Sequence, residues 1–520
     1  MYEERLEPVK FGNNGGGRSP NSSRESKMTR LRSSSFSDSL DDINSSEEMH
    51  IRTSGLRRRR REHFGSRDGS NWDRVVTITR ELRIPDTIRI KRSLRLPEFG
   101  PKILFFSGGT AIRDLSACLI NYTHNSIHLI TPFDSGGSSA EIRRGFDMLS
   151  VGDIRNRLLA LSDKSESTMR NHPQVIELFS HRLTKSDIEE SEEEFLTILE
   201  GKHPLIRAVE LPMRSILQNH LRWFSQRMPS DFDLRGASIG NLIITGCFLE
   251  HNRDIVTAIF MIAKFLGVKG ACRPLTAANL HIRALYEDGR EVVGQHAMNV
   301  SPKAPSTTLN TDTAPTQSHK IVQIDLVKEL QDSSTTERQQ AQTCHIDILS
   351  SDLVSSSADL ICFPMGSFFA SILVNLLPRG VGRAIVERKC PKVYIPNTGY
   401  DPEMAGRTLA ECVALIIEMV RNDPDHVSHL DDGSFQDEAK TLVPVENILN
   451  FVLLDTLHCE YGVPIDKDEI EKLGVTVINM TLVDCEANNV CIDSSNEPGR
   501  EKSKVLDPKK VAEVLISLSS

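Results

Sequence analysis

The stretch from Lys102 to Thr131 decides the fold, and it reads KILFFSGGTAIRDLSACLINYTHNSIHLIT. Its opening KILFFS is a continuous apolar run that ends in a glycine turn, as in a strand buried on both faces. After Thr110 the apolar residues recur at helical spacing, and Ser126–Thr131 returns to a strand. Strand, turn, helix and strand make a βαβ unit, which predicts parallel strands with the turn at the carboxyl end of the first.

A second unit of this kind lies further along the chain. Residues 358–377, ADLICFPMGSFFASILVNLL, predict a buried strand at Leu360–Phe363, a turn, and a helix from near Phe368. Lys392–Asn397 supplies another strand. The predicted fold class is therefore α/β, with a mostly parallel sheet flanked by helices. The turns around Gly108 and Gly366 are expected to face one edge of the sheet, where open α/β sheets bind ligands.

The rest of the chain divides by composition. Residues 1–74 are rich in Ser, Arg, Gly and Asn and are predicted to be a disordered tail. The alternating pattern of residues 75–100 predicts lead-in strands, and residues 101–520 the α/β domain. Within that domain we expect a helical insertion at about residues 164–235 and a polar loop at about residues 301–320.

Charge and cysteine usage exclude several classes of protein. The formal net charge of -9 argues against nucleic acid as a partner, although the tail carries five arginines at Arg57–Arg61. The ten cysteines form no C-x-x-C pair, so neither a zinc ribbon nor a disulfide framework is indicated. The chain shows neither a signal peptide nor a run of 18 apolar residues. We therefore expect a cytoplasmic protein without a membrane partner.

The first glycine turn is a candidate phosphate site. Gly108, Gly109 and Thr110 follow the strand and open a helix, where backbone N–H groups can approach an anion closely. An ordinary strand-to-helix turn explains the same letters, so the turn alone is weak evidence.

A second candidate wall follows the next strand and reads DSGGSS. Asp134 stands at the strand end, where a carboxylate can ligate Mg²⁺ or accept a proton from an attacking hydroxyl. The residues after it offer backbone amides and hydroxyls to phosphate oxygens, namely Gly136, Gly137, Ser138 and Ser139. Helix capping is the alternative for the two serines.

The segment GDIRN opens another helical pattern. Arg155 can hold a phosphate in bidentate fashion, with Asp153 positioning it and Asn156 beside it. Capping of the helix is an equal explanation for Asp153.

Six motifs in order resemble one family over roughly residues 102–518. They are GGT, DSGGSSAEIRR, GDIRNRLLAL, GASIGNL at Gly236–Leu242, AKFLGVKGACRPLT and ADLICFPMGSFFASI. In this order they are similar to the CofD/YvcK family, which implies a Rossmann-like sheet with a ligand cleft over the strand ends. The resemblance places the nucleotide and phosphate contacts on the three segments above, on Asn241, and on Gly366 and Ser367. Lys264 or Lys269 is a further candidate for a phosphate contact.

The resemblance implies two functions. One branch of the family transfers a phospholactyl group from a nucleotide diphosphate conjugate with Mg²⁺, which makes Asp134 the catalytic and metal-binding residue. The other binds UDP-sugars and regulates carbon metabolism and the cell envelope without an established reaction. A transferase is our first expectation and a UDP-sugar sensor the alternative, in either case as a homodimer.

The chain departs from the family pattern at three places. The usual GGGTG is SGGTA, the second acid of the usual DDGGSS is Ser135, and the usual GPGS is PMGS. Loss of one carboxylate at Ser135 is expected to weaken a two-acid Mg²⁺ site.

Overall fold

The computed structural model describes residues 81–163, 172–298, 320–328, 343–426, 443–483 and 505–519. From Leu82 onward they belong to one compact unit. The predicted tail at residues 1–74 and almost all of the predicted polar loop at 301–320 lie outside the described residues. None of the helices in these ranges combines the length and apolar character needed to cross a membrane.

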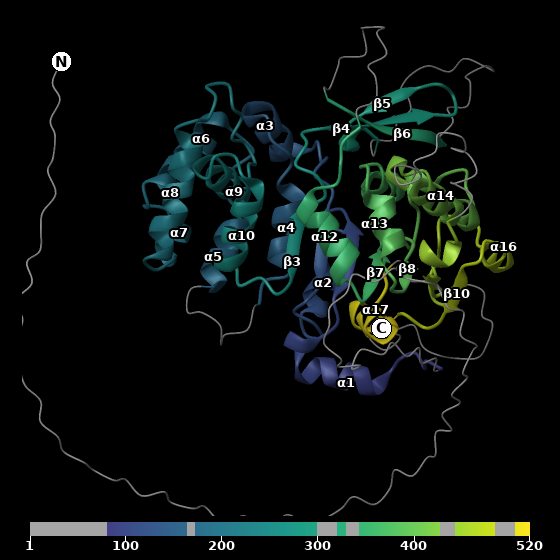
Figure 1. The fold of residues 1–520 in the computed structure, drawn as a ribbon. Coiled ribbons are helices and arrows are strands. Elements are labelled where there is room, and N and C mark those ends of the chain that lie inside the picture. Colours follow the sequence, from purple (N-terminus) through teal and green to yellow (C-terminus); the bar gives the residue numbers. More distant parts are fainter. Residues whose placement is uncertain are drawn as a thin grey trace, which may run out of the picture. The chain divides into compact units, whose positions relative to one another are not determined.

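The centre of the unit is a seven-stranded parallel sheet, which confirms the predicted α/β fold class (Figure 1). The strand order is β10-β9-β8-β7-β1-β2-β3. The bounds are β1 Ile103–Ser107, β2 Ile127–Ile130, β3 Ala271–Pro274, β7 Leu360–Phe363, β8 Lys392–Tyr394, β9 Phe451–Leu454 and β10 Thr476–Asn479. The chain runs outward from β1 to β3 and then returns to β7 on the other side of β1. The topological switch point, where α/β sheets bind ligands, is therefore at the carboxyl ends of β1 and β7.

Both faces of the sheet are covered, and the central strands β1 and β7 are mostly apolar and buried along their whole length. Ile103 and Phe105 of β1 pack on one face with α2 (Arg113–Leu119) and α17 (Pro508–Leu518). Leu104 and Phe106 pack on the other with α12 (Ile348–Ser357), α13 (Val381–Glu387) and α14 (Leu409–Arg421). Side chains alternate along a strand, so a continuous apolar run needs two covered faces, as the sequence predicted.

A block of helices lies beside β3 (Figure 1). It comprises α5 His172–Ser180, α6 Ile188–Leu199, α7 Pro204–Ala208, α8 Met213–Ser225, α9 Ile239–Glu250 and α10 Ile255–Phe265. The first four occupy the range of the predicted helical insertion. The block continues past residue 235 because α9, apolar on all sides, is buried among its neighbours.

A small antiparallel sheet, which the sequence analysis did not predict, stands apart from the main sheet. Its order is β5-β4-β6, with β4 at His281–Tyr286, β5 at Glu291–Val293 and β6 at Ile321–Val327. The short helix α11 (Gln295–Met298) follows β5 and brings Gln295 to the carboxyl edge of the main sheet.

Shorter elements complete the unit. They are η1 Pro97–Phe99, α3 Gly137–Phe146, α4 Gly152–Ala160, the π-helix η2 Phe368–Ile372, η3 Leu373–Leu376, η4 Pro402–Met404, η5 Pro424–His426, η6 Val445–Asn447 and α16 Lys467–Lys472.

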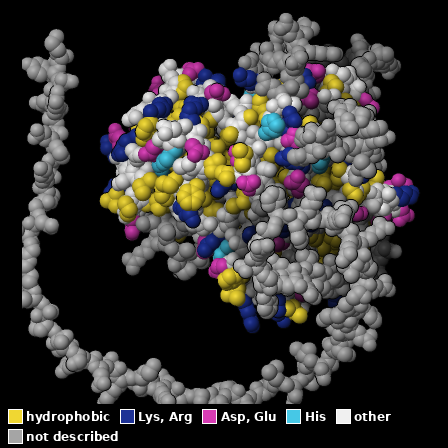
Figure 2. Space-filling model, viewed as in Figure 1, with side chains coloured by type: hydrophobic (Ala, Val, Ile, Leu, Met, Phe, Trp, Pro, Cys, Tyr) yellow, Lys and Arg dark blue, Asp and Glu magenta, His cyan; other side chains and the backbone are white. Residues whose placement is uncertain are grey.

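The prediction of lead-in strands is wrong for the described part of residues 75–100. Thr87–Arg95 is a helix, α1, which Asp86 caps by accepting hydrogen bonds from two backbone N–H groups at 3.1 Å each. Its buried residues are Ile90 and Ser93, and this spacing of three puts both on one helical face. In the sequence, Ile88 and Ile90 alternate with Arg89 and Lys91, and this alternation led to the prediction of a strand. Figure 2 shows hydrophobic and basic side chains side by side at the bottom of the view, where Figure 1 places α1.

The close approach of α8 and α9 generates a first prediction. A Cβ on Gly246 would lie 1.8 Å from the carbonyl oxygen of His220, so a methyl group must displace the backbone of α8. We expect Gly246→Ala to lower the free energy of unfolding by about 3 kcal/mol, measured by chemical denaturation. Gly145→Ala in α3 is the matched control, because its methyl would meet side-chain atoms at 3.2–3.5 Å. A change in the control as large as that in Gly246→Ala would contradict this explanation.

Candidate functional site

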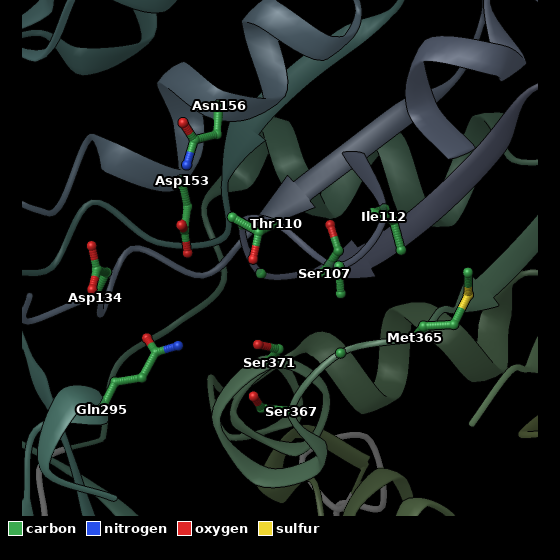
Figure 3. Close-up of a pocket in the computed structure, with 14 residues that line it drawn as sticks. Ser107, Thr110, Ile112, Asp134, Asp153, Asn156, Gln295, Met365, Ser367 and Ser371 are labelled. Atoms are coloured by element: carbon green, nitrogen blue, oxygen red, sulfur yellow. The ribbon is translucent and has the colours of Figure 1, made fainter. Parts of the chain in front are cut away.

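A cavity of about 330 Å³ opens at the switch point of the sheet (Figure 3). Asp134 and Asp153 lie on one side of it, and Ser367 and Ser371 lie on the other. Its lining residues come from the turns after β1, β2 and β7, from α4 and from α11: Ser107, Gly108, Gly109, Thr110, Ala111, Ile112, Asp134, Asp153, Asn156, Gln295, Met365, Gly366, Ser367 and Ser371. The structure thus brings together eight of the residues predicted for the site: Gly108, Gly109, Thr110, Asp134, Asp153, Asn156, Gly366 and Ser367.

The first glycine turn is held from below by a buried arginine. Arg157 in α4 is fully buried and donates hydrogen bonds to the carbonyl oxygens of Gly108 at 3.0 Å, Gly109 at 3.1 Å and Ile112 at 3.0 Å. A further bond goes to the hydroxyl of Ser116. Because the guanidinium engages the carbonyls, the opposite side of these peptide groups is left for a ligand.

The N–H groups of this turn are available to a ligand. Those of Gly109, Thr110 and Ala111 have no hydrogen-bond acceptor among the described residues, and all three residues line the cavity. The hydroxyl of Ser107, which also lines the cavity, is buried without a partner in that part of the chain. Consecutive free amides at a strand end form an anion-binding site.

The carboxylate of Asp153 lies so close to Gly109 that it leaves no room for a side chain at position 109. A Cβ at this position would lie 1.9 Å from Oδ1 of Asp153, so the carboxylate occupies the space that any side chain would need. The first residues of α4 therefore pack directly on the glycine turn. The capping reading of Asp153 is not supported, because the N-cap of α4 is Val151 and no side chain caps this helix.

Asp134 is fixed by the turn that follows β2. Its Oδ1 accepts a hydrogen bond from the N–H of Gly136 at 3.0 Å. Its backbone is held by Arg143, another buried arginine, which donates to the carbonyl oxygens of Phe133 at 3.3 Å and Asp134 at 3.2 Å. Burial lowers the pKa of Arg143 to about 10, so it stays cationic at neutral pH.

The two acids of the cavity interact. Burial raises the pKa of Asp153 to about 7, and the charge of Asp134 raises it further, while Arg157 opposes the shift. Two neighbouring carboxylates can hold a divalent cation, which relieves their repulsion. Alternatively, an acid that titrates near neutral pH can accept a proton.

The second turn, after β7, differs from the first because most of its N–H groups are bonded to side chains. Asn397 accepts from the N–H of Gly366 at 2.8 Å, and Asp401 from that of Phe368 at 3.1 Å. Glu403 accepts from the next two N–H groups, at 2.7 and 2.8 Å. Gly366 and Ser367 line the cavity as predicted, and this wall adds the hydroxyl groups of Ser367 and Ser371.

Six predicted site residues do not line the cavity. Gly136 bonds to Asp134, and Gly137 begins α3 with a φ of 50°. Asn241 donates from Nδ2 to the hydroxyl of Ser138 at 3.1 Å. Ser139 lies against Gly152, where a Cβ would meet its Oγ at 2.5 Å and Oδ2 of Asp134 at 3.3 Å. These residues support Asp134 from behind.

Arg155, the sixth, was predicted to clamp a phosphate but points away from the cavity. It donates to Ser238 at the start of α9 and, at 2.6 Å, to Oδ1 of Asn156. Its role in the structure is to orient Asn156. Lys264 and Lys269 are also absent from the lining: Lys264 lies over the ring of Phe260, and Lys269 pairs with Asp163 at 3.7 Å.

Ser135, which stands where the family has a second acid, does not face the cavity either. Its hydroxyl accepts a hydrogen bond from the N–H of His296 at 3.2 Å and so ties the turn after β2 to α11. Asp153 supplies the second carboxylate of the cavity in its place. From the sequence, Asp153 was expected to position Arg155 or to cap the helix, because the sequence does not show that its side chain lies near Asp134.

One other group of side chains could ligate a metal among the described residues: His181, Glu194 and His203. Glu194 accepts from His181 at 2.6 Å and from the N–H of Thr184 at 2.9 Å. Nδ1 of His203 accepts from the N–H of Leu205 and caps α7. These three side chains therefore make hydrogen bonds within the helical block.

Amides without an acceptor among the described residues and two carboxylates lie together at the switch point of a parallel sheet, which is the usual ligand site of an α/β protein. Comparison with known proteins gives the family: the profile described as "2-phospho-L-lactate transferase CofD" matches residues 103–483, and the chain belongs to this family.

Two relatives agree with that membership, and one solved structure shares the fold. The "Gluconeogenesis factor" of Bacillus subtilis is 26% identical over 386 residues, covering 74% of this chain and 91% of the relative. A "Putative gluconeogenesis factor" of Nostoc sp. is 25% identical over 319 residues, which cover 61% of this chain and 52% of that relative. A UPF0052 family member from Bacillus halodurans has the same fold, with a TM-score of 0.51 at 20% identity over 80% of this chain and 99% of that one.

The hydrogen bonds from Arg157 to the first turn give a second prediction. A lysine retains the charge but cannot reach four acceptors, so Arg157→Lys should lower the free energy of unfolding by about 2–4 kcal/mol. It should also weaken binding of pyrophosphate, measured by isothermal titration, at least about tenfold. Arg421→Lys is the control, because Arg421 donates to the carbonyl of Val443 outside the cavity. Unchanged pyrophosphate affinity in a folded Arg157→Lys variant would refute the bracing role.

Glu403 gives a prediction on pH. Burial raises its pKa from the ordinary 4.5 to about 7, with Asp401 as the second cause. The folded state therefore holds this proton more tightly than the unfolded state, so the associated stability is complete below about pH 4.5 and is lost as the pH rises through 7. Glu403→Gln should reduce this loss by at most about 3 kcal/mol, measured by denaturation at about pH 5 and pH 8. Parallel profiles for variant and parent would contradict the assignment.

Proposed function

We propose that the cavity binds the diphosphate of a nucleotide diphosphate conjugate and that the protein transfers the phosphorylated group of this donor to an acceptor hydroxyl. The observation that carries the proposal is the pairing of three free amides on the first turn with two carboxylates, Asp134 and Asp153, in one cavity. Binding and positioning of phosphates account for most of phosphoryl-transfer catalysis.

Each wall has a role in this proposal. The amides of Gly109, Thr110 and Ala111 receive the phosphate oxygens and stabilise charge that develops on them. The acceptor oxygen attacks phosphorus, the bond from phosphorus to the bridging oxygen breaks, and the nucleoside monophosphate leaves. Asp153 accepts the proton of the acceptor hydroxyl, since a pKa of about 7 suits this task. Ser367 and Ser371 orient the acceptor from across the cavity.

The donor set fits Mg²⁺ at Asp134. One oxygen of this carboxylate bonds to the N–H of Gly136, and the other lies toward the cluster around Gly152. The neighbouring charge of Asp153 adds to the preference for a cation there. When bound, Mg²⁺ would neutralise charge on the phosphate oxygens.

A second function is favoured by the relatives that are described as gluconeogenesis factors. In this alternative the same cavity binds a UDP-sugar, and a partner protein senses its occupancy without any reaction. Ser135, bonded to α11, would then link the cavity to the small sheet. A homodimer remains a prediction from the family resemblance in both cases.

Substitution of Asp134 tests the transferase. We expect Asp134→Asn to lower turnover by about 10²- to 10⁴-fold while leaving nucleotide affinity within a few-fold, because the amide neither binds Mg²⁺ well nor carries the charge. Turnover is measured as release of GMP or UMP from diphosphate conjugates, and affinity by isothermal titration. Asp288→Asn, on a hairpin away from the cavity, is the control.

The outcomes separate the two functions. Turnover that survives Asp134→Asn rules out the catalytic role of this residue. Tight binding of UDP-sugars by the parent protein, with no product detected by mass spectrometry across acceptors, supports the sensor. If neither the titrations nor mass spectrometry of copurified small molecules finds a nucleotide, both functions are excluded.

A further inference from the structure

The surface of α1 and η1 carries an apolar patch that the proposed function leaves unexplained. Five of its large side chains are exposed, and we call them the α1 patch: Leu82 (39% exposed), Ile88 (66%), Leu94 (48%), Leu96 (56%) and Phe99 (85%). They make up five of the fifteen exposed large hydrophobic residues in the described part of the chain, within fewer than twenty residues of sequence. Such clustering marks a site of interaction.

The patch is rigidly presented. The opposite face of α1 buries Ile90 and Ser93 in the core shared with α17. The N–H of Asp86 donates to the hydroxyl of Ser517 at 2.8 Å, and Arg89 donates to carbonyl oxygens at the end of α17. Since the inner face of α1 is fixed in this way, its two exposed apolar side chains, Ile88 and Leu94, stay at the surface.

Cations surround the patch. Arg83, Lys91, Arg92 and Arg95 are exposed on the same segment, whereas Glu98 is the one exposed acid between Leu82 and Phe99. This excess of positive charge contrasts with the net charge of -9 of the whole chain. Figure 2 shows basic side chains next to hydrophobic ones in this part of the surface.

We propose that the α1 patch docks on the surface of a bilayer that contains anionic phospholipids. Exposed apolar side chains with Lys and Arg beside them are suited to the interface, where apolar groups enter the headgroup region and cations meet lipid phosphates. This contact needs no spanning segment, and it concerns a face of the molecule other than the cavity.

Two other occupants fit the observations less well. A second copy of the chain, docked symmetrically, would place the same cations against one another. An acidic protein would need pockets for its anchoring side chains, whereas the side chains of the α1 patch protrude, with Phe99 85% exposed. A bilayer needs protruding apolar groups and positive charge, and both are present.

The five arginines Arg57–Arg61, which no other feature explains, precede α1 in the sequence. Stable membrane association requires two weak signals acting together, such as an apolar insertion and a polybasic segment. Each basic residue near an anionic surface contributes about 1 kcal/mol. The arginine run and the α1 patch therefore supply complementary signals.

Co-sedimentation with vesicles tests the proposal on the full-length protein. We expect binding to vesicles of phosphatidylcholine mixed with phosphatidylserine, weakened by salt, and little binding to phosphatidylcholine alone. The triple variant Ile88→Ser, Leu96→Ser, Phe99→Ser should lose affinity at least about tenfold. The control triple Leu211→Ser, Leu457→Ser, Val505→Ser removes side chains that are 67%, 72% and 68% exposed elsewhere and should bind within about twofold of the parent.

Charge variants complete the test. Lys91→Gln, Arg92→Gln, Arg95→Gln should weaken binding and flatten its salt dependence, and replacing Arg57–Arg61 by Gln should weaken it in part. Absence of binding to anionic vesicles would overturn the proposal. Equal binding by the α1-patch variant and the parent would do the same, because attraction by the arginine run alone would then suffice. A change in sedimentation coefficient of the α1-patch variant without vesicle binding would point to a second copy instead.

Discussion

The buried guanidinium of Arg157 is the interaction on which the ligand cavity depends. It takes three backbone carbonyls of one turn, including those of Gly108 and Gly109, and leaves the N–H groups of Gly109 and Thr110 without an acceptor among the described residues. A glycine turn by itself has many conformations, and the hydrogen bonds of the arginine restrict them. Arg143 acts similarly on the backbone of Asp134 after the next strand. Two arginines on successive helices, Arg143 on α3 and Arg157 on α4, thus hold the two turns that line the cavity.

The sequence predicted the fold well because local patterns determine it. Continuous apolar strands such as Ile103–Ser107 indicate burial on both faces, and the turns that follow them identify the carboxyl edge of the sheet. The antiparallel sheet around β4 was missed because β5 has only three residues and β6 pairs with β4 from more than thirty residues further along the chain. α1 was assigned as strand because Ile88 and Ile90 alternate with Arg89 and Lys91 in the sequence.

The candidate site was predicted less completely, and the errors share one cause. Arg155 and Arg157 are two residues apart on α4 and so point to different sides of the helix; the sequence favoured the first, whereas the second contacts the turn. The second carboxylate was expected at position 135, but Ser135 bonds to α11, and Asp153 of α4 lines the cavity in its place. The direction of both side chains depends on how α4 and α11 pack. Residue type and spacing indicate the chemistry that is available, but packing decides which side chains face the cavity.

The two glycine turns of the site are not equivalent. The N–H groups of Gly366, Phe368 and Phe369 are bonded to Asn397, Asp401 and Glu403, whereas Gly109 and Thr110 have no acceptor among the described residues. The first turn therefore offers more backbone donors to a ligand than the second, and the carboxylates of Asp134 and Asp153 lie beside it.

The contact between Gly109 and Asp153 constrains how this site can change during evolution. The carboxylate fills the volume of a Cβ, so position 109 can accept a side chain only after position 153 has become smaller or moved. The two positions cannot drift independently, although they are separated by more than forty residues. A descendant that lost the acid would be free to lose the glycine, and the order of those two losses would be fixed.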